Sequence, residues 1–240
     1  MTHTDSYSNL RKLLCNGHGL FISLTSISIA CMWQIHHDLQ SHSALLSNAI
    51  IFLTSGLFGL TLFNNKESPL NNATGSSTWI FHVVCGFVIF VLISNLLTGA
   101  QTDWETLLKV ALGIALLLAF YCALSKLMTK GNPDNLFGLQ LVLMLYFLLL
   151  TAPLWLGPIA FYFANNSQVV NSIINLSPLS YLASLMDYDY LRSSWFYQNT
   201  PFGGLRYEYL DSLVNSMIYI IFTIAIFYSQ KVRILNNIGK

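Results

Sequence analysis

Six apolar segments, most of them close to the length of a membrane-spanning helix, dominate the 240-residue sequence. A helix of about 20 apolar residues crosses the hydrocarbon core of a bilayer, and helices satisfy their own backbone hydrogen bonds in lipid. The segments lack the alternating pattern of a membrane β-barrel. The sequence therefore predicts an all-α integral membrane protein, a six-transmembrane-helix bundle that forms one domain over residues 1–240. The predicted spans are Gly19–Ile35, Ala44–Phe63, Trp79–Leu97, Leu107–Met128, Leu136–Phe163 and Leu213–Tyr228.

The composition and the missing motifs exclude several functions. Hydrophobic residues make up 54% of the chain and charged residues 9%, against about 25% charged residues in soluble domains. The net charge of +1 predicts no nucleic-acid binding. The sequence has no phosphate-binding loop, no HExxH zinc motif, no GxSxG nucleophile elbow and no charge in the middle of a predicted span. We therefore expect no catalysis by this chain, no cofactor and no ion-coupled transport.

The distribution of Lys and Arg predicts the orientation in the membrane. Loops on the side of the two termini hold eight Lys and Arg residues, and loops on the other side hold three. Because basic residues stay preferentially in the cytoplasm, we expect a multi-pass protein of the cell (inner) membrane with both termini cytoplasmic. The first apolar segment follows Arg11 and Lys12 and could instead be a cleaved secretory signal, although an uncleaved span explains the same residues.

The region between the last two spans carries unusual patterns. Pro153 and Pro158 predict either a kink or a break in the fifth span. The following "VVNSIINLSPLSYLASLM" is too short to span and predicts interfacial or re-entrant helices, with Pro178 in the first turn of a new helix. We interpret residues 164–211 as an external cap between spans five and six.

The cap is rich in aromatic and charged residues. Its aromatic residues fit the headgroup region of the membrane, where they would anchor the cap; they are Trp195, Phe196, Tyr197, Tyr207 and Tyr209. Its charged residues could pair around the Gly203–Gly204 turn; they are Asp187, Asp189, Arg192, Arg206 and Glu208. Asp211 is expected to cap the last helix. Alternatively, Asp187 and Asp189 face a translocation path or bind a cation.

A second polar cluster lies in the first external loop. The stretch "QIHHDLQSHS" places His36, His37, Asp38 and His42 within seven residues. Imidazole and carboxylate groups at this spacing permit binding of zinc, copper or iron. The other interpretation is a short polar turn without a metal.

The layout resembles the permease subunits of type 2 ABC exporters. The likeness rests on "APLWLGPIAFYFANN", on "INLSPLSYLASLMDYDYLRSSWFY" and on six spans with both ends inside. The resemblance implies a dimer, formed with a second copy or a homologue, on separate cytoplasmic ATP-binding subunits. It also implies that residues 1–18, as an amphipathic segment, and the loop Asn64–Ser77 contact the ATPase. The residues expected there are Leu10, Arg11, Lys12, Lys66 and Glu67.

Three functional hypotheses follow. The leading one is a permease subunit of an ATP-driven ABC transporter, and the uncharged spans favour an apolar or amphipathic cargo. The alternative is a non-catalytic interaction subunit of a larger membrane complex, with the aromatic cap as its docking surface. The third is a membrane enzyme whose metal is bound by the histidine-rich loop.

Overall fold

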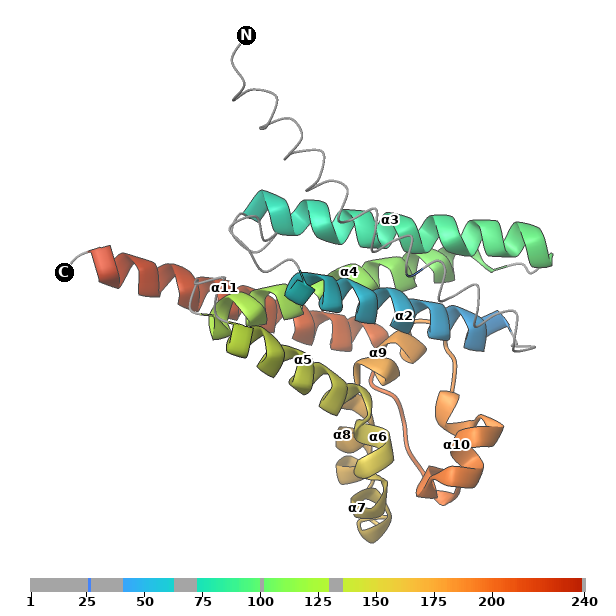
Figure 1. Cartoon of the computed structure of the whole chain (residues 1–240). Helices are drawn as coiled ribbons and strands as arrows, with labels where there is room; N and C mark the ends of the chain where they lie inside the picture. The colour runs from blue at the N-terminus through green and yellow to red at the C-terminus, as the bar shows by residue number, and fades with distance from the viewer. Residues whose placement is uncertain (1–25, 27–40, 63–72, 100–101, 130–135, 239–240) are drawn as a thin grey trace.

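The structure is a computed structural model that describes residues 26, 41–62, 73–99, 102–129 and 136–238. The described part is all-helical, without β-strands, and its longest helices run side by side (Figure 1). These long helices are α2 (Ser41–Leu62), α3 (Ala73–Thr98), α4 (Trp104–Met128) and α11 (Ser212–Ile238). The all-α prediction is thereby confirmed for the described residues.

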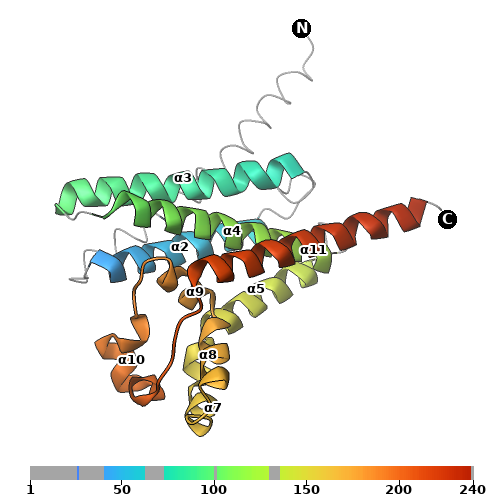
Figure 2. The ribbon, with the colours of Figure 1, turned by 180° about the vertical axis from the view of Figure 1, so that it is seen from behind.

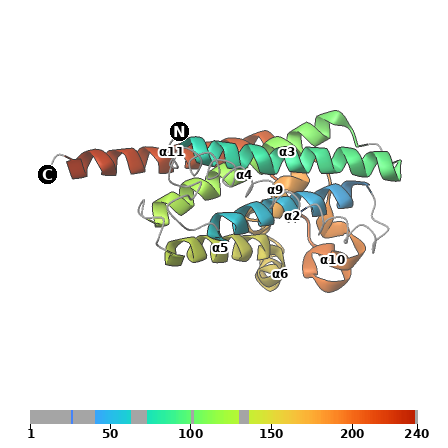
Figure 3. The ribbon, with the colours of Figure 1, turned by 45° about the horizontal axis from the view of Figure 1, so that its top comes forward.

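Helix α4 lies at the centre of the bundle. It packs against α2, α3 and α11 and against the shorter α5 (Leu136–Leu150), and Figure 3 shows the neighbouring helices around it. Val110, Ile114 and Leu117 on α4 are fully buried, so this helix contributes apolar side chains to the core between its neighbours. Asp103 caps its first turn by accepting a hydrogen bond from the Thr106 amide at 3.3 Å.

Four described helices are long and apolar enough to cross a membrane. These segments are His42–Leu60, Ser76–Leu97, Trp104–Met128 and Ser212–Ser229. They correspond to four of the six predicted spans and support a multi-pass membrane protein. Apart from Ser26, the predicted span Gly19–Ile35 lies outside the described residues.

The fifth predicted span is broken. Helix α5 has 15 residues and ends at Leu150, and the chain continues as α6 (Ala152–Trp155) and α7 (Gly157–Tyr162). Each short helix has a proline in its first turn, a position where proline's missing backbone donor is tolerated. Of the two alternatives, kink or break, the structure shows the break: α6 and α7 run across the direction of the long helices (Figures 1 and 2).

The chain then returns to the bundle through α8 (Ser167–Asn175) and α9 (Pro178–Ser184). Ser177 caps α9 by accepting a hydrogen bond from the Leu179 amide at 3.2 Å, and Pro178 occupies the first helical position as predicted. Helix α9 packs against α2, α4, α5 and α11. A seven-residue helix thus lies among four longer ones.

The remainder of the cap is irregular. After α9 come the 3₁₀ helix η1 (Tyr190–Arg192), α10 (Ser194–Asn199) and the 3₁₀ helix η2 (Pro201–Gly204). Residues 205–211, here called the strap, then lead without helical structure into α11. Asp211 caps α11 by accepting hydrogen bonds from the Leu213 and Val214 amides at 2.8 and 3.4 Å, which confirms the predicted capping role.

Candidate functional site

The cap is fixed to the bundle through α9. Tyr181, Leu182 and Ala183 are buried there, and the hydroxyls of Tyr181 and Ser216 lie 2.8 Å apart, joining α9 to α11. Gly113 on α4 allows this approach, because a Cβ atom at this position would overlap the Leu185 side chain. The cap residues that follow α9 therefore begin from a defined place at the end of the bundle.

Asp189 is the centre of the candidate site, which we call the Asp189 cluster: Asp189, Arg192, Tyr207 and Tyr209. The Tyr207 hydroxyl donates to both carboxylate oxygens, at 2.9 and 3.1 Å. The Tyr209 hydroxyl donates to Oδ1 at 2.8 Å. Two hydroxyls of the strap thus hold one carboxylate that lies 18 and 20 residues earlier in the chain.

Arg192 completes the cluster from the outside. Its Nε lies 3.2 Å from Asp189 Oδ2, and its side chain is 69% exposed against 32% for Asp189. Its guanidinium also lies over the ring of Tyr207, 5.8 Å from the centroid. An exposed ion pair of this kind contributes little to stability, so the hydroxyl groups are the more important partners of Asp189.

The protonation of these tyrosines suits their role as donors. Burial raises the pKa of Tyr209 and of Tyr207 above the ordinary value for tyrosine, and the hydrogen bond and charge of Asp189 raise both further. Their hydroxyls therefore keep their protons at physiological pH. The cluster is a hydrogen-bonded clamp between the η1 region and the strap.

Three aromatic rings in contact, here called the wall, support the cluster: those of Tyr190, Phe196 and Tyr209. Tyr190 is buried, and its hydroxyl lies 2.9 Å from that of the buried Ser180 on α9. Its ring contacts Phe196 edge-on at 5.1 Å between centroids and Tyr209 at 6.2 Å. Burial raises the pKa of Tyr190, so this hydroxyl also stays protonated. The wall connects the cluster to α9 and thus to the bundle.

Two asparagines of α8 bind the other edge of the strap. Asn171 Oδ1 accepts a hydrogen bond from the Glu208 amide at 2.9 Å. Asn175 Oδ1 accepts one from the Leu210 amide at 2.8 Å, and its Nδ2 donates to the Glu208 carbonyl at 3.3 Å. The two side chains, one helical turn apart, thus act as a neighbouring β-strand would.

The charged residues predicted to pair in the cap do so only in part. Asp189 and Arg192 come together, as expected of an ion pair, but both lie on the same arm of the loop. The side chains of Asp187, Arg206 and Glu208 are exposed and make no ion pair among the described residues. Asp187 instead adopts the left-handed conformation, with φ of 51°, between α9 and η1. Hydrogen bonds from tyrosine, rather than charge pairs, join the two arms.

The aromatic residues of the cap that were predicted to anchor it at the headgroups differ in their burial. Phe196, Tyr207 and Tyr209 are partly buried in the wall and the cluster, whereas Tyr197 is 60% exposed. The side chain of Trp195 lies outside the described residues. Phe196, Tyr207 and Tyr209 therefore make contacts within the cap, whereas Tyr197 is exposed at its surface.

Several predicted site residues lie outside the described part of the chain. These are Leu10, Arg11, Lys12, Lys66 and Glu67 of the expected ATPase contact, and His36, His37 and Asp38 of the histidine-rich loop. His42 is described: it is exposed, and its ring stacks on Tyr188 with centroids 6.3 Å apart. Among the described residues, no group of three or more His, Cys, Asp and Glu side chains could hold a metal.

The sequence alone did not predict the asparagine pair or the polar contacts within the bundle. The spacing of Asn171 and Asn175 on an amphipathic segment was a signal that one helical face carries two amides. Inside the bundle, the Thr54 and Tyr146 hydroxyls lie 2.7 Å apart. The rings of Tyr146 and Tyr121 contact each other at 5.3 Å between centroids. Among the described residues, the buried polar side chains of the bundle carry hydroxyl and amide groups rather than charges.

Comparisons with known proteins give no relative: no family model matches the chain, and no curated protein or solved structure matches it significantly.

Proposed function

We propose that this chain is the membrane-spanning permease subunit of an ATP-driven ABC transporter, with six spans, both termini in the cytoplasm and a separate ATP-binding subunit. The observation that carries the proposal is the element between α5 and α11. There the chain leaves the bundle at Leu150, and α9 returns to pack among α2, α4, α5 and α11. This arrangement supports the resemblance to type 2 exporters, whose permeases carry short external helices before the last span.

The interior of the bundle supports an apolar or amphipathic cargo. The charged residues in the candidate spans lie near helix ends: Glu105 and Lys109 in the first two turns of α4, and Lys126 in its last turn. In the described part of the bundle, the buried polar groups between these ends are hydroxyls and amides, including those of Asn48, Tyr121 and Asn215. A path for a charged solute usually needs charged or strongly polar partners within the membrane.

The fixed cap suits a subunit that moves as a rigid body. The strap connects α11 directly to the cap and is held by the Asp189 cluster on one edge and by Asn171 and Asn175 on the other. A displacement of α11 would therefore carry the cap with it. In the proposed cycle, ATP binding in the partner moves two permeases, the second being a copy or a homologue, against each other.

Co-purification with an ATPase tests this proposal. The tagged chain, extracted in mild detergent from its native membrane, should retain a protein that binds MgATP and is labelled by a photoreactive ATP analogue. The charge reversals Arg11→Glu and Lys12→Glu in the expected contact segment should release that protein. The matched control is Arg206→Glu in the exposed part of the cap, which should leave the complex intact. Repeated purification of the unaltered chain without a nucleotide-binding subunit would refute the proposal.

A non-catalytic interaction subunit is the second candidate, and the position of Tyr197 favours it. This side chain is 60% exposed and lies over Gly203, where a Cβ atom would overlap its ring. Tyrosine is a common anchor residue of protein interfaces. Tyr197→Ala should then release a partner without changing the thermal stability of the chain, whereas an unchanged set of co-purified proteins would argue against this function.

A further inference from the structure

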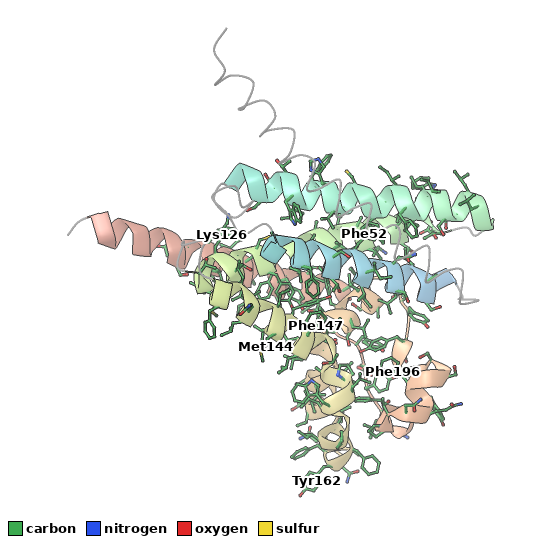
Figure 4. All side chains as sticks on the ribbon, in the orientation of Figure 1. Phe52, Lys126, Met144, Phe147, Tyr162 and Phe196 are labelled. Atoms are coloured by element: carbon green, nitrogen blue, oxygen red, sulfur yellow. The ribbon has the colours of Figure 1, made fainter. Side chains whose placement is uncertain are left out.

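The arm formed by α6, α7 and α8 has two chemically different faces. On α6 and α7 the buried positions hold small residues, namely Ala152, Pro153, Gly157 and Ala160. The large side chains on these helices point outward, and Tyr162 lies at the tip of the arm, away from the bundle (Figure 4). The exposed residues are Leu154, Trp155, Ile159, Phe161 and Tyr162. In water this order would be inverted, because large apolar side chains are normally buried.

Helix α8 has the opposite pattern. Val170 and Ile174 are fully buried, and α8 packs against α6 and α7. Its exposed positions include Ser167, Gln168 and Ser172. Large apolar residues therefore face inward on α8 and outward on α6 and α7, and no Asp, Glu, Lys or Arg occurs between residues 152 and 175.

The apolar face of the arm continues the apolar surface of α5. Phe137 and Met144 on α5 are strongly exposed, and Phe147 and Leu148 line an open apolar hollow with Thr151 and Trp155, where α5 gives way to α6. Beyond this hollow, Ile159 and Tyr162 on α7 are also exposed. Figure 4 shows Met144, Phe147 and Tyr162 in this order from α5 to the tip. Large apolar side chains are thus exposed on α5, α6 and α7 alike, which implies the same apolar solvent for the three helices.

The position along the bundle axis at which the arm begins can be derived from residue positions on α4 and α5. The rings of Tyr121 and Tyr146 are in contact, Lys109 precedes Tyr121 by 12 residues and Leu150 follows Tyr146 by four. At about 1.5 Å per residue, Lys109 lies about 18 Å and the end of α5 about 6 Å beyond this contact, toward the cap. The chain thus leaves α5 about 12 Å before the level of the exposed Lys109–Glu105 ion pair. Because charged side chains are costly inside the bilayer, we take the level of this pair as the membrane boundary on the cap side.

We propose that the arm lies within the cap-side leaflet of the membrane and separates lipid from water, as a partition. The exposed face of α6 and α7 contacts the acyl chains of lipids, and the exposed face of α8 contacts a water-accessible recess. Polar side chains and irregular backbone at membrane depth are tolerated where water or protein covers them. Large apolar side chains at the same depth are at their lowest free energy in hydrocarbon. This inference goes beyond transport by ATP hydrolysis and does not depend on the partner subunit.

Collision accessibility of nitroxide spin labels tests the partition. The four cysteines are replaced by alanine, and single cysteines are introduced as Tyr162→Cys on α7 and Ser172→Cys on α8. The lipid reference is Ile221→Cys, at a 63% exposed position of α11. The purified chain is reconstituted into phosphatidylcholine and phosphatidylglycerol vesicles. The labels are then exposed to oxygen, which concentrates in the bilayer, or to a water-soluble nickel chelate.

The label at residue 162 should behave as the label at residue 221, with high oxygen and low nickel accessibility. The label at residue 172 should show the reverse. A nickel-accessible label at residue 162 would overturn the proposal, and so would a label at residue 172 with lipid-like accessibility. Exclusion of both reagents at either position would place a protein surface, such as a second copy, on that face and would also overturn it. Ile159→Cys on the same face as Tyr162 provides a repeat if the first label perturbs the tip.

Discussion

The hydroxyl oxygens of Thr54 and Tyr146 lie 2.7 Å apart and join α2 to α5 inside the bundle. Such hydrogen bonds between membrane helices contribute about 0.6 kcal/mol on average and at most about 1.7 kcal/mol. Tyr146→Phe should lower the free energy of unfolding within this range, because the Thr54 hydroxyl loses its partner. Unfolding in mixed micelles by increasing SDS measures the change.

The matched control for that substitution is Tyr121→Phe. The Tyr121 ring contacts that of Tyr146, but its buried hydroxyl has no hydrogen-bond partner among the described residues. Removing a buried hydroxyl without a partner removes an uncompensated desolvation cost, so stability should stay constant or rise. Equal losses in the two variants would show that ring packing, rather than the Thr54 hydrogen bond, determines the effect.

Asp189→Ala should loosen the strap. The substitution leaves the Tyr207 and Tyr209 hydroxyls without their acceptor, which should lower the free energy of local opening by about 1–3 kcal/mol. Trypsin cleavage after Arg206, which lies in the strap, should accelerate by about tenfold for each 1.4 kcal/mol. The control is Asp187→Gly, because this exposed residue has φ of 51°, a conformation that glycine adopts freely. Comparable cleavage rates in both variants would contradict the clamp.

Alkaline pH should weaken the same clamp. The pKa of Tyr207 and of Tyr209 is raised above 10.0 by burial and by Asp189. The folded cap therefore binds these protons more tightly than the unfolded chain does, so its stability is complete below pH 10 and falls as the pH rises above it. Ultraviolet absorbance of tyrosinate should rise at a higher pH in the native protein than in SDS. The double variant Tyr207→Phe, Tyr209→Phe should reduce this difference, and an unchanged difference would exclude these two residues as its source.

The hydropathy of the sequence predicted the long helices because each membrane-spanning helix must by itself be long and apolar enough to cross the bilayer. The segments Ala44–Phe63 and Leu107–Met128 correspond closely to α2 and α4. Proline also acts locally, so Pro153 and Pro178 indicated the disturbance after α5 and the start of α9. The sequence left the choice between kink and break open, since it depends on whether α9 can pack back on the bundle.

The candidate site could be predicted only in part. The Asp189–Arg192 pair is local, with a spacing of three residues. The tyrosine donors are 18 and 20 residues away from Asp189, and α8 lies more than 30 residues from the strap that it binds. Contacts at such separations depend on how the whole cap folds. A tyrosine can anchor at a headgroup or donate to a carboxylate, and composition does not distinguish these roles.

Asn175→Ala should release the edge of the strap that α8 binds. The Asn175 amide binds both the Leu210 amide and the Glu208 carbonyl, so hydrogen exchange of Leu210 should accelerate. Asn175→Asp retains the acceptor for the Leu210 amide but not the donor, and should show a smaller increase. The control is Ser172→Ala, whose hydroxyl binds only the Gln168 carbonyl of its own helix among the described residues. Uniform exchange in the three variants would rule out the asparagine pair as a partner of the strap.

Gly138→Ala should separate α5 from the end of α4. A Cβ atom at residue 138 would lie 2.9 Å from the carbonyl carbon and oxygen of Met128 and 3.0 Å from the Thr129 nitrogen. Backbone atoms cannot move aside as a flexible side chain can, so the helices must shift, and overpacking of this kind costs about 1–3 kcal/mol. Gly204→Ala is the control, because no atom lies within 4 Å of its added Cβ. Unfolding in SDS should show a loss for Gly138→Ala and none for Gly204→Ala, and a neutral Gly138→Ala would mean that α5 does not contact α4 as closely as the structure shows.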